Sequence, residues 1–178
     1  NSHLMAGGCI AMGNMKFIGS VFSLIESGVT VFYGVPSTYR ILLRYPDRFK
    51  KAFSNVKTAA SAGGGMTRQI VRNIKELVHG IEILPMYGQT EATARLAYVP
   101  KEDVEEFIET IGKPIPGVTL DVFASKGQPV GPNVTAELVA KGDNILLGYL
   151  DDEVATKKKI IDGWMYTGDL AQKLPNGY

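Results

Sequence analysis

The feature that most constrains the fold is the alternation of helical and strand patterns over the first hundred residues. The helical segments carry apolar residues three and four positions apart, and the strand segments are short runs of apolar, β-branched or aromatic residues. Strands separated by helices predict a parallel sheet that binds ligands at the carboxyl ends of its strands. The segments occur in the order helix 15–28, strand 29–35, helix 37–45 with Ser37 as its N-cap, strand 56–62, helix 66–80 and strand 81–88.

The pattern changes near residue 105, where short β segments succeed one another and are separated by Gly, Pro and Asn. One short helical pattern at 151–161 interrupts them, and GWMYTGDLAQKLPNGY at 163–178 predicts a strand, a turn and a strand. Such spacing is typical of a small antiparallel, barrel-like unit. We therefore expect an α/β fold, with a parallel-sheet αβ subdomain at 6–105 followed by a small β-barrel-like subdomain at 106–178.

Composition narrows the class of protein. The chain has 178 residues, a formal net charge of +1 and 45% hydrophobic residues, which is typical of a globular domain and implies neither a nucleic-acid partner nor an anionic membrane surface. Cys9 is the single cysteine, so a disulfide framework and a thiolate metal site are excluded. No apolar run is long enough to span a membrane, and we expect a cytoplasmic protein. We interpret residues 1–5 as partly vector-derived.

Two glycine-containing loops come after predicted strands. The first, SAGGGM at 61–66, allows close approach of a ligand to the backbone and offers N–H groups to a planar or anionic group. Taken alone, the three glycines are more typical of a flexible turn. They match neither the phosphate loop with its lysine nor the GxGxxG dinucleotide motif, so a Rossmann dehydrogenase loses support.

The second loop, YGQTE at 87–91, carries more chemistry. A tyrosine ring stacks on a base, Gly88 permits close approach, a threonine hydroxyl donates to a phosphate oxygen, and a glutamate is a hard oxygen ligand for Mg²⁺. In the last segment, Asp169 stands on a turn beside Gly168, where a carboxylate can accept hydrogen bonds from two ribose hydroxyls. Each motif alone also fits an ordinary polar turn.

Together the motifs resemble the superfamily of adenylate-forming enzymes, which includes acyl-CoA synthetases, peptide-synthetase adenylation domains and luciferases. SAGGGM, YGQTE, GKPIPGV, AELVAKGDNILLGYLDD and GWMYTGDLAQKLPNGY occur here in the family's order, and GVTVFYGVPSTYRILL resembles the stretch before the acyl pocket of acyl-CoA synthetases. The resemblance covers nearly the whole chain. It implies a ligase of acyl-CoA and fatty acid metabolism that activates a carboxylic acid with ATP and Mg²⁺, releases pyrophosphate, and passes the acyl group to CoA.

The resemblance also implies roles for individual residues. Thr90 would contact the α-phosphate and Glu91 would bind Mg²⁺, which makes these two the catalytic residues. Asp169 would hold the ribose hydroxyls, and the ring of Tyr87 would pack on the adenine. Where many relatives carry Asn, Gln or Asp, this chain has Pro85, so contacts to the adenine amino group would come from backbone carbonyls. The expected nucleotide-binding set is Gly63, Gly64, Gly65, Tyr87, Gly88, Gln89, Thr90 and Asp169.

The family's serine- and glycine-rich phosphate loop, its hinge and its catalytic lysine have no counterpart in this sequence. We therefore expect a fragment of the large N-terminal domain that does not adenylate by itself. Two alternatives stay open: a peptide-synthetase or acyl-carrier-protein ligase, and a non-catalytic nucleotide-binding module. Gln89 favours a CoA ligase, because peptide-synthetase domains more often have proline there. The sequence does not name the acid.

Overall fold

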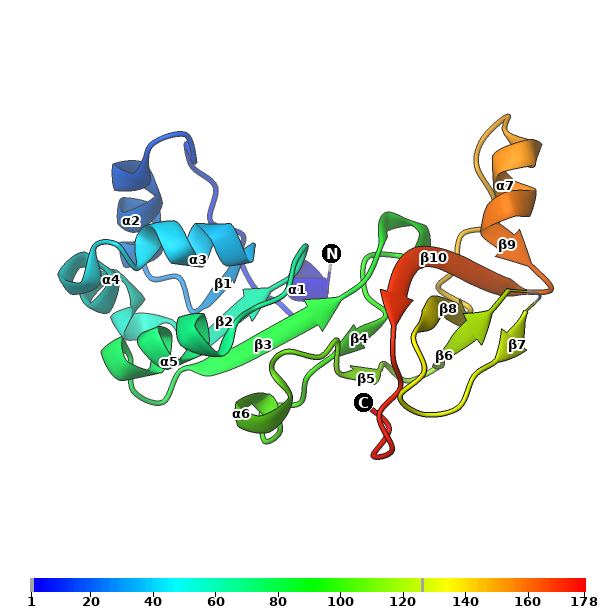
Figure 1. Ribbon diagram of the computed structural model, residues 1–178. Helices are drawn as coiled ribbons and strands as arrows, with labels where there is room; N and C mark the ends of the chain where they lie inside the picture. The colour runs from blue at the N-terminus through cyan, green and yellow to red at the C-terminus, as the bar shows by residue number, and fades with distance from the viewer. Residues whose placement is uncertain (1, 126) are drawn as a thin grey trace. The chain divides into compact units, whose positions relative to one another are not determined.

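The computed structural model describes residues 2–125 and 127–178 (Figure 1). The chain forms two compact units, Asn1–Leu84 and Pro85–Tyr178. Asn1, to which the interpretation of residues 1–5 extends, lies outside the described part. In that part, no helix is long and apolar enough to cross a lipid bilayer. The subdomain boundary expected at residue 105 stays a prediction.

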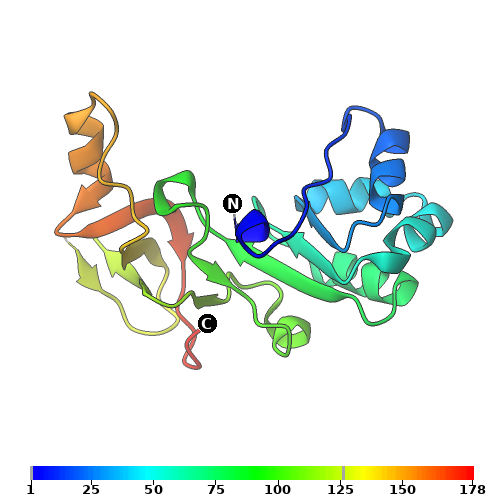
Figure 2. The same ribbon diagram turned by 180° about the vertical axis from the view of Figure 1, so that it is seen from behind.

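The first unit surrounds a pair of parallel strands with helices (Figures 1 and 2). Strand β1, Val31–Gly34, pairs in parallel with β2, Thr58–Ser61, so that Val31 lies opposite Thr58. Parallel strands need a long crossover, and two helices and a 3₁₀ turn supply it here. The helical elements are α1 Ser2–Met5, α2 Ile18–Glu26, α3 Pro36–Leu42, α4 Pro46–Ala52, η1 Phe53–Asn55 and α5 Arg68–Leu77.

Aromatic side chains hold the first unit together. Tyr39 of α3 is fully buried, and its hydroxyl donates to the carbonyls of Phe32 at 3.1 Å and Ala60 at 2.8 Å. This hydroxyl therefore links β1 to β2 from the helix that covers them. The buried rings of Phe49 and Phe53 stack with centroids 4.0 Å apart. Burying each ring contributes roughly 2 to 3 kcal/mol.

The start of α3 differs from the sequence-based expectation. Val35 is the N-cap, Pro36 is the first helical residue, and no side chain caps the helix. The prediction of Ser37 as N-cap was wrong because proline's fixed φ already suits the first helical turn and its missing N–H is not needed there. The amphipathic helix α5 begins as the pattern indicates, with Thr67 as N-cap accepting from the Ile70 amide at 3.4 Å.

Strand β3, Glu82–Tyr87, carries the chain into the second unit. There its last residues pair antiparallel with β4, Ala97–Tyr98, and β4 pairs antiparallel with β5, Lys113–Pro114. Pro85 donates no hydrogen bond, but its carbonyl accepts from the Val99 amide at 3.1 Å. At the end of the strand, Tyr87 therefore pairs with Ala97 of β4, and the rest of the YGQTE turn follows.

The second unit is dominated by an antiparallel sheet with strand order β7-β6-β8-β10-β9, which curls in both views (Figures 1 and 2). Ala92, Leu96, Ala140 and Met165 form a buried cluster, and the Tyr87 ring packs against it. The remaining elements are η2 Thr90–Ala92, α6 Val104–Phe107, β6 Val118–Ala124, β7 Gln128–Pro129, β8 Ala136–Gly142, α7 Glu153–Lys159, β9 Ile160–Ile161 and β10 Trp164–Ala171.

A bulge in β10 shapes the site. Tyr166 pairs with Val139, but the next pair is Leu170 with Glu137, so β10 advances further than β8 between them. Gly168 adopts a φ of 85° inside this bulge, which suits glycine. The extra residues lift Asp169 out of the ladder. The expected fold class is confirmed: parallel strands with helices, followed by a small curled antiparallel sheet.

Candidate functional site

The turn after β3 is built around Gly88. A Cβ atom at this position would lie 2.1 Å from the carbonyl oxygen of Ala94, so only glycine fits. The turn folds back tightly, and the Ala94 amide donates to the Gln89 carbonyl at 3.2 Å. Thr93 and Ala94 adopt φ values of 50° and 72°, a left-handed conformation that costs free energy for non-glycine residues. Surrounding contacts must therefore hold the turn in place.

Asn144 supplies those contacts. Its Nδ2 donates to the carbonyl of Ala92 at 2.9 Å and to that of Arg95 at 3.1 Å. Two positions further on, the Leu146 amide donates to the Glu91 carbonyl at 2.8 Å. The segment 144–146 thus fixes the backbone from Glu91 to Arg95, at the end of the YGQTE turn and just beyond it. Sequence reasoning missed Asn144, because an asparagine before an apolar run gives no sign of a partner about fifty positions away.

Three predicted residues converge in the second unit. The Tyr87 hydroxyl donates to Oδ2 of Asp169 at 2.6 Å, and Nε2 of Gln89 donates to the same oxygen at 3.1 Å. Nε2 also donates to the Thr167 carbonyl at 3.0 Å. Within the described residues, the hydrogen bonds to this carboxylate fall on Oδ2, which leaves Oδ1 for a ligand.

The Tyr87 hydroxyl is kept protonated in this arrangement. Burial raises the pKa of Tyr87, and the hydrogen bond to Asp169 raises it further. A protonated hydroxyl beside an ionised carboxylate is a strong, charge-assisted donor. Tyr87 therefore fixes the Asp169 side chain, which is otherwise exposed.

Glu91 has a different environment. Its Oε1 accepts a hydrogen bond from the Tyr149 hydroxyl at 2.7 Å. This hydrogen bond is the main reason that the pKa of Glu91 is lowered, with a smaller contribution from the charge of Lys159. The carboxylate is thus ionised at neutral pH. Thr90, its neighbour on η2, is exposed to solvent. Sequence reasoning did not identify Tyr149 or Lys159.

The ionised Glu91 carboxylate suits a metal site that other ligands complete. Among residues 2–125 and 127–178, no group of three His, Cys, Asp or Glu side chains could hold a metal ion. Mg²⁺ differs from zinc or calcium because it is commonly bound by one or two carboxylates together with substrate phosphates. The Glu91 carboxylate therefore fits Mg²⁺ bound with a nucleotide.

Gly63, Gly64 and Gly65 lie in the first unit, in the exposed loop between β2 and α5. Gly63 has a φ of 77°, and a Cβ at Gly65 would meet nothing within 4 Å. Among the described residues of the first unit, no packing demands glycine at Gly65. The contact of these glycines with adenine stays a prediction.

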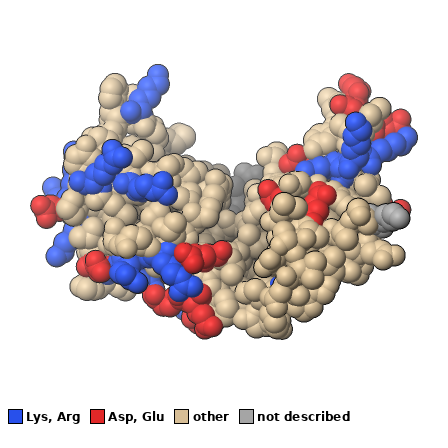
Figure 3. Space-filling model, in the orientation of Figure 1, with Lys and Arg blue, Asp and Glu red and all other residues tan. Residues whose placement is uncertain are grey.

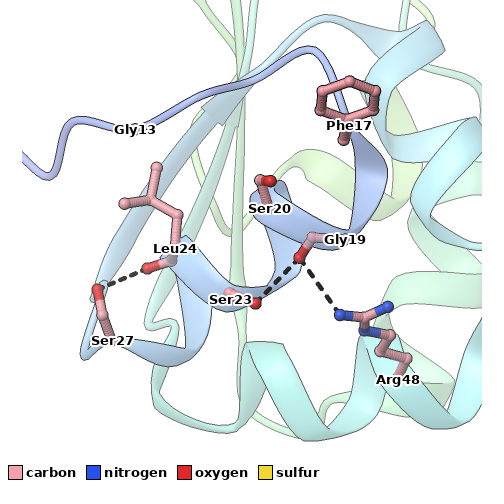
Figure 4. Close-up of a pocket in the computed structure, with 8 residues that line it drawn as sticks. All are labelled: Gly13, Phe17, Gly19, Ser20, Ser23, Leu24, Ser27 and Arg48. Carbon is pink, nitrogen blue, oxygen red and sulfur yellow. Dashed lines mark hydrogen bonds between the residues drawn. The ribbon is translucent and has the colours of Figure 1, made fainter.

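A separate hollow of about 650 Å³ lies on the first unit beside α2 (Figure 4). Its charged group, Arg48, is already engaged: the guanidinium lies 4.8 Å from the centroid of the Phe22 ring and donates to the Gly19 carbonyl at 3.3 Å. The hydroxyls of Ser23 and Ser27 donate to backbone carbonyls of their own helix. Three of the polar side chains that line the hollow are thus engaged within the chain, and Ser20 is the remaining one.

The sequence and the fold are similar to those of known proteins. The family model described as AMP-binding enzyme matches residues 1–150. The chain is 28% identical over 176 residues to a feruloyl-CoA synthase of Amycolatopsis, covering 98% of this chain and 35% of the relative. It is 32% identical over 161 residues to a long-chain-fatty-acid–CoA ligase of Salmonella typhimurium, covering 90% of this chain and 28% of the relative.

Among solved structures, a benzoate CoA ligase from Burkholderia xenovorans superposes with a TM-score of 0.79 at 29% identity, over 88% of this chain and 32% of that one. The chain thus spans about a third of the length of the relatives it matches. The family match extends over most of its residues and includes the YGQTE turn and the Tyr149 that bonds Glu91. This chain belongs to the family of AMP-binding enzymes.

Proposed function

We propose that the second unit carries the ribose-facing and metal-facing part of an ATP site, and that the whole protein is an AMP-forming acid–thiol ligase. The observation that carries the proposal is the convergence of Tyr87 and Gln89 on Asp169, with Glu91 on the same turn. A carboxylate with one oxygen fixed and the other open suits a ribose diol. An ionised glutamate a few residues away suits a metal bound to phosphates.

The reaction has two steps. In the first, a carboxylate oxygen of the acid attacks the α-phosphorus of ATP, the bond to the β-phosphate bridge breaks, and pyrophosphate leaves with its electron pair. In the second, a thiol sulfur attacks the acyl carbon, loses its proton to solvent, and AMP leaves. The first step needs no general base because the acid is already ionised. Its barrier is the approach of an anion to a polyanion, which donors and cations lower.

Each residue has a role in that scheme. Asp169 accepts hydrogen bonds from the ribose hydroxyls, while Tyr87 and Gln89 hold its carboxylate. Thr90 donates its exposed hydroxyl to the α-phosphate. Glu91 contributes a ligand to Mg²⁺, and the bound ion supplies positive charge that offsets the charge on the phosphates.

We propose CoA as the thiol, because the relatives named above are CoA ligases and because Gln89 occupies the position where carrier-protein systems more often have proline. For the acid substrate we propose only the class, a carboxylic acid. The relatives named above act on feruloyl, benzoate and long-chain acyl groups, so both aryl and aliphatic acids belong in a substrate panel. ATP, CoA and a carboxylic acid are the partners this proposal requires.

Calorimetry with AMP and Mg²⁺ on the 178-residue chain tests the nucleotide site. We expect saturable binding that Asp169→Ala weakens by about tenfold or more, since a hydrogen bond to a charged group is lost. Asp143→Ala is the matched control, because Asp143 is an exposed aspartate outside the site. Absence of AMP binding by the wild-type chain, or equal binding by both variants, contradicts the site.

The ligase reaction is tested on the whole protein that contains this sequence. An acid panel is scored by pyrophosphate release, first without a thiol and then with CoA or with a carrier-protein pantetheine. Acid-dependent release and subsequent CoA thioester formation support the proposal. AMP binding without acid-dependent release identifies a non-catalytic nucleotide-binding module instead.

A further inference from the structure

Helix α7 ends in three lysines, and they differ in their surroundings. Lys157 and Lys158 are exposed, and Lys157 pairs with Glu153 one turn earlier at 3.0 Å. Basic and acidic side chains gather around this helix at the upper right of Figure 3. Lys159, by contrast, is half-buried and turns toward the site. A run of lysines usually marks a solvated face, so the inward position of Lys159 needs a cause.

The Lys159 ammonium contacts two acceptors. Its Nζ lies 3.3 Å from Oε1 of Gln89 and 3.2 Å from the carbonyl oxygen of Thr167. An ammonium group only donates hydrogen bonds, so Gln89 must turn its oxygen toward it. The amide nitrogen of Gln89 is then left to donate to the Asp169 carboxylate and to the Thr167 carbonyl. A cation on one side and an anion on the other thus select one of the two amide orientations.

The same lysine also supports the bulge in β10. The Thr167 carbonyl lies where the register between β10 and β8 shifts, and both Lys159 and Gln89 donate to it. The Thr167 hydroxyl accepts from the Asp169 amide at 3.1 Å and donates to the Leu138 carbonyl at 2.7 Å. Lys159 therefore touches both parts of the chain that place the Asp169 carboxylate.

We propose that Lys159 is a positioning residue of the nucleotide site: its ammonium orients the Gln89 amide and holds the bulge carbonyl, so that Asp169 is presented to the ribose hydroxyls of a bound nucleotide. The proposal rests on the function proposed above for Asp169. Lys159 does not itself contact the ribose. Its effect is therefore on selectivity for the ribose hydroxyls.

The binding test compares AMP with 2′,3′-dideoxy-AMP, both with Mg²⁺, by calorimetry on the 178-residue chain. Lys159→Met keeps the aliphatic stem and removes the donors, whereas Lys159→Arg keeps a permanent donor. We expect Lys159→Met to reduce the preference for AMP over its dideoxy analogue by about three- to tenfold. Lys159→Arg should restore most of that preference. Lys158→Met is the matched control and should behave as wild type, because Lys158 is exposed on the same helix.

A second measurement needs no nucleotide. In ¹⁵N-labelled protein, the Gln89 side-chain amide should show separate, slowly exchanging protons, and Lys159→Met should speed their exchange, because the amide is no longer held in one orientation. Unchanged Gln89 exchange in Lys159→Met overturns the positioning role, whatever the binding data show. If the wild-type chain binds no AMP but Lys159→Met releases Gln89, the nucleotide site fails while the orientation of Gln89 by Lys159 stands. Unaltered ribose selectivity in a chain that binds AMP overturns the proposal and leaves the nucleotide site intact.

Discussion

The two glycine-containing loops of this chain use glycine for opposite reasons. Gly88, after β3, is required by the chain's own packing, because a Cβ there would collide with the backbone of Ala94. Gly65, after β2, has open space where a Cβ would stand. The Gly88 turn is also held by Asn144, whereas the loop at 63–65 is exposed.

The difference separates structural from ligand-related glycine. The shape of the Gly88 turn is set by contacts within the second unit, which fix the orientation of its side chains toward a ligand. The loop at 63–65 gains nothing from Gly65 within its own unit, so glycine there suits either mobility or close approach of another molecule. Substitutions in the two loops should therefore differ in their effect on stability: a substitution at Gly88 should lower both stability and AMP binding, and one at Gly65 should lower AMP binding alone.

The largest effect is expected for Gly88→Ala. The added methyl group must displace the backbone of Ala94, so the free energy of unfolding should fall by about 3 kcal/mol. Urea denaturation monitored by circular dichroism measures this. AMP binding should be lost as well, since Tyr87 and Gln89 flank the displaced segment. A stability equal to wild type would show that the turn adapts and would remove the contrast between the loops.

The next effect is expected for Asn144→Ala. Removing the amide leaves the carbonyls of Ala92 and Arg95 without their donor, which should lower the free energy of unfolding by about 2 kcal/mol. Asn55→Ala, at an exposed position on η1 in the first unit, is the control and should change stability little. Equal stability losses in the two variants would mean that Asn144 does not hold the turn.

Secondary structure and several site residues could be predicted from the sequence. The contacts between residues far apart in the chain could not. Helix and strand periodicity predicts the alternating elements, and YGQTE together with Asp169 identifies residues that meet although Tyr87 and Asp169 are 82 positions apart. That success came from resemblance to a family, since each motif alone also fits an ordinary turn. The α3 N-cap failed because a local proline effect outweighed the serine.

Lys159 lies outside the family motifs, and the motif AELVAKGDNILLGYLDD, which contains Asn144 and Tyr149, does not indicate which residues these two contact. Gln89 meets Lys159 because of the β10 bulge and the end of α7, and neither the bulge nor the end of the helix is encoded by a local motif. The Tyr149 hydroxyl reaches Glu91 across 58 positions. Such partners depend on strand register, which short-range patterns leave undetermined.

A smaller effect is expected for Tyr149→Phe. This substitution leaves the Gly88 turn intact but removes the hydrogen bond that the Glu91 carboxylate accepts. The pKa of Glu91 is held below its ordinary value of 4.5 chiefly by the Tyr149 hydrogen bond, so its removal should raise this pKa. A group with a lowered pKa stabilises the fold above its ordinary pKa, and that contribution is lost as the pH falls through the lowered value. The variant should therefore lose less stability than wild type on acidification below about pH 4.5.

A ¹³C carboxyl titration monitored by NMR measures the Glu91 pKa directly. Asp103 is an internal control, because its pKa is lowered first by a different tyrosine, Tyr178, and should not move in Tyr149→Phe. A Glu91 pKa that is the same in wild type and Tyr149→Phe would mean that the hydrogen bond is not formed in solution.

The smallest effect on stability is expected for Gly65→Ala, and it is the sharpest test of the comparison between the loops. Since nothing lies within 4 Å of the added Cβ, the free energy of unfolding should stay within about 0.5 kcal/mol of wild type. AMP binding should nevertheless weaken by about tenfold if adenine packs against this loop. Gly131→Ala is the matched control, because Gly131 also has open space around it and lies outside the proposed site. Equal AMP binding by the two variants would show that Gly65 serves only a flexible turn.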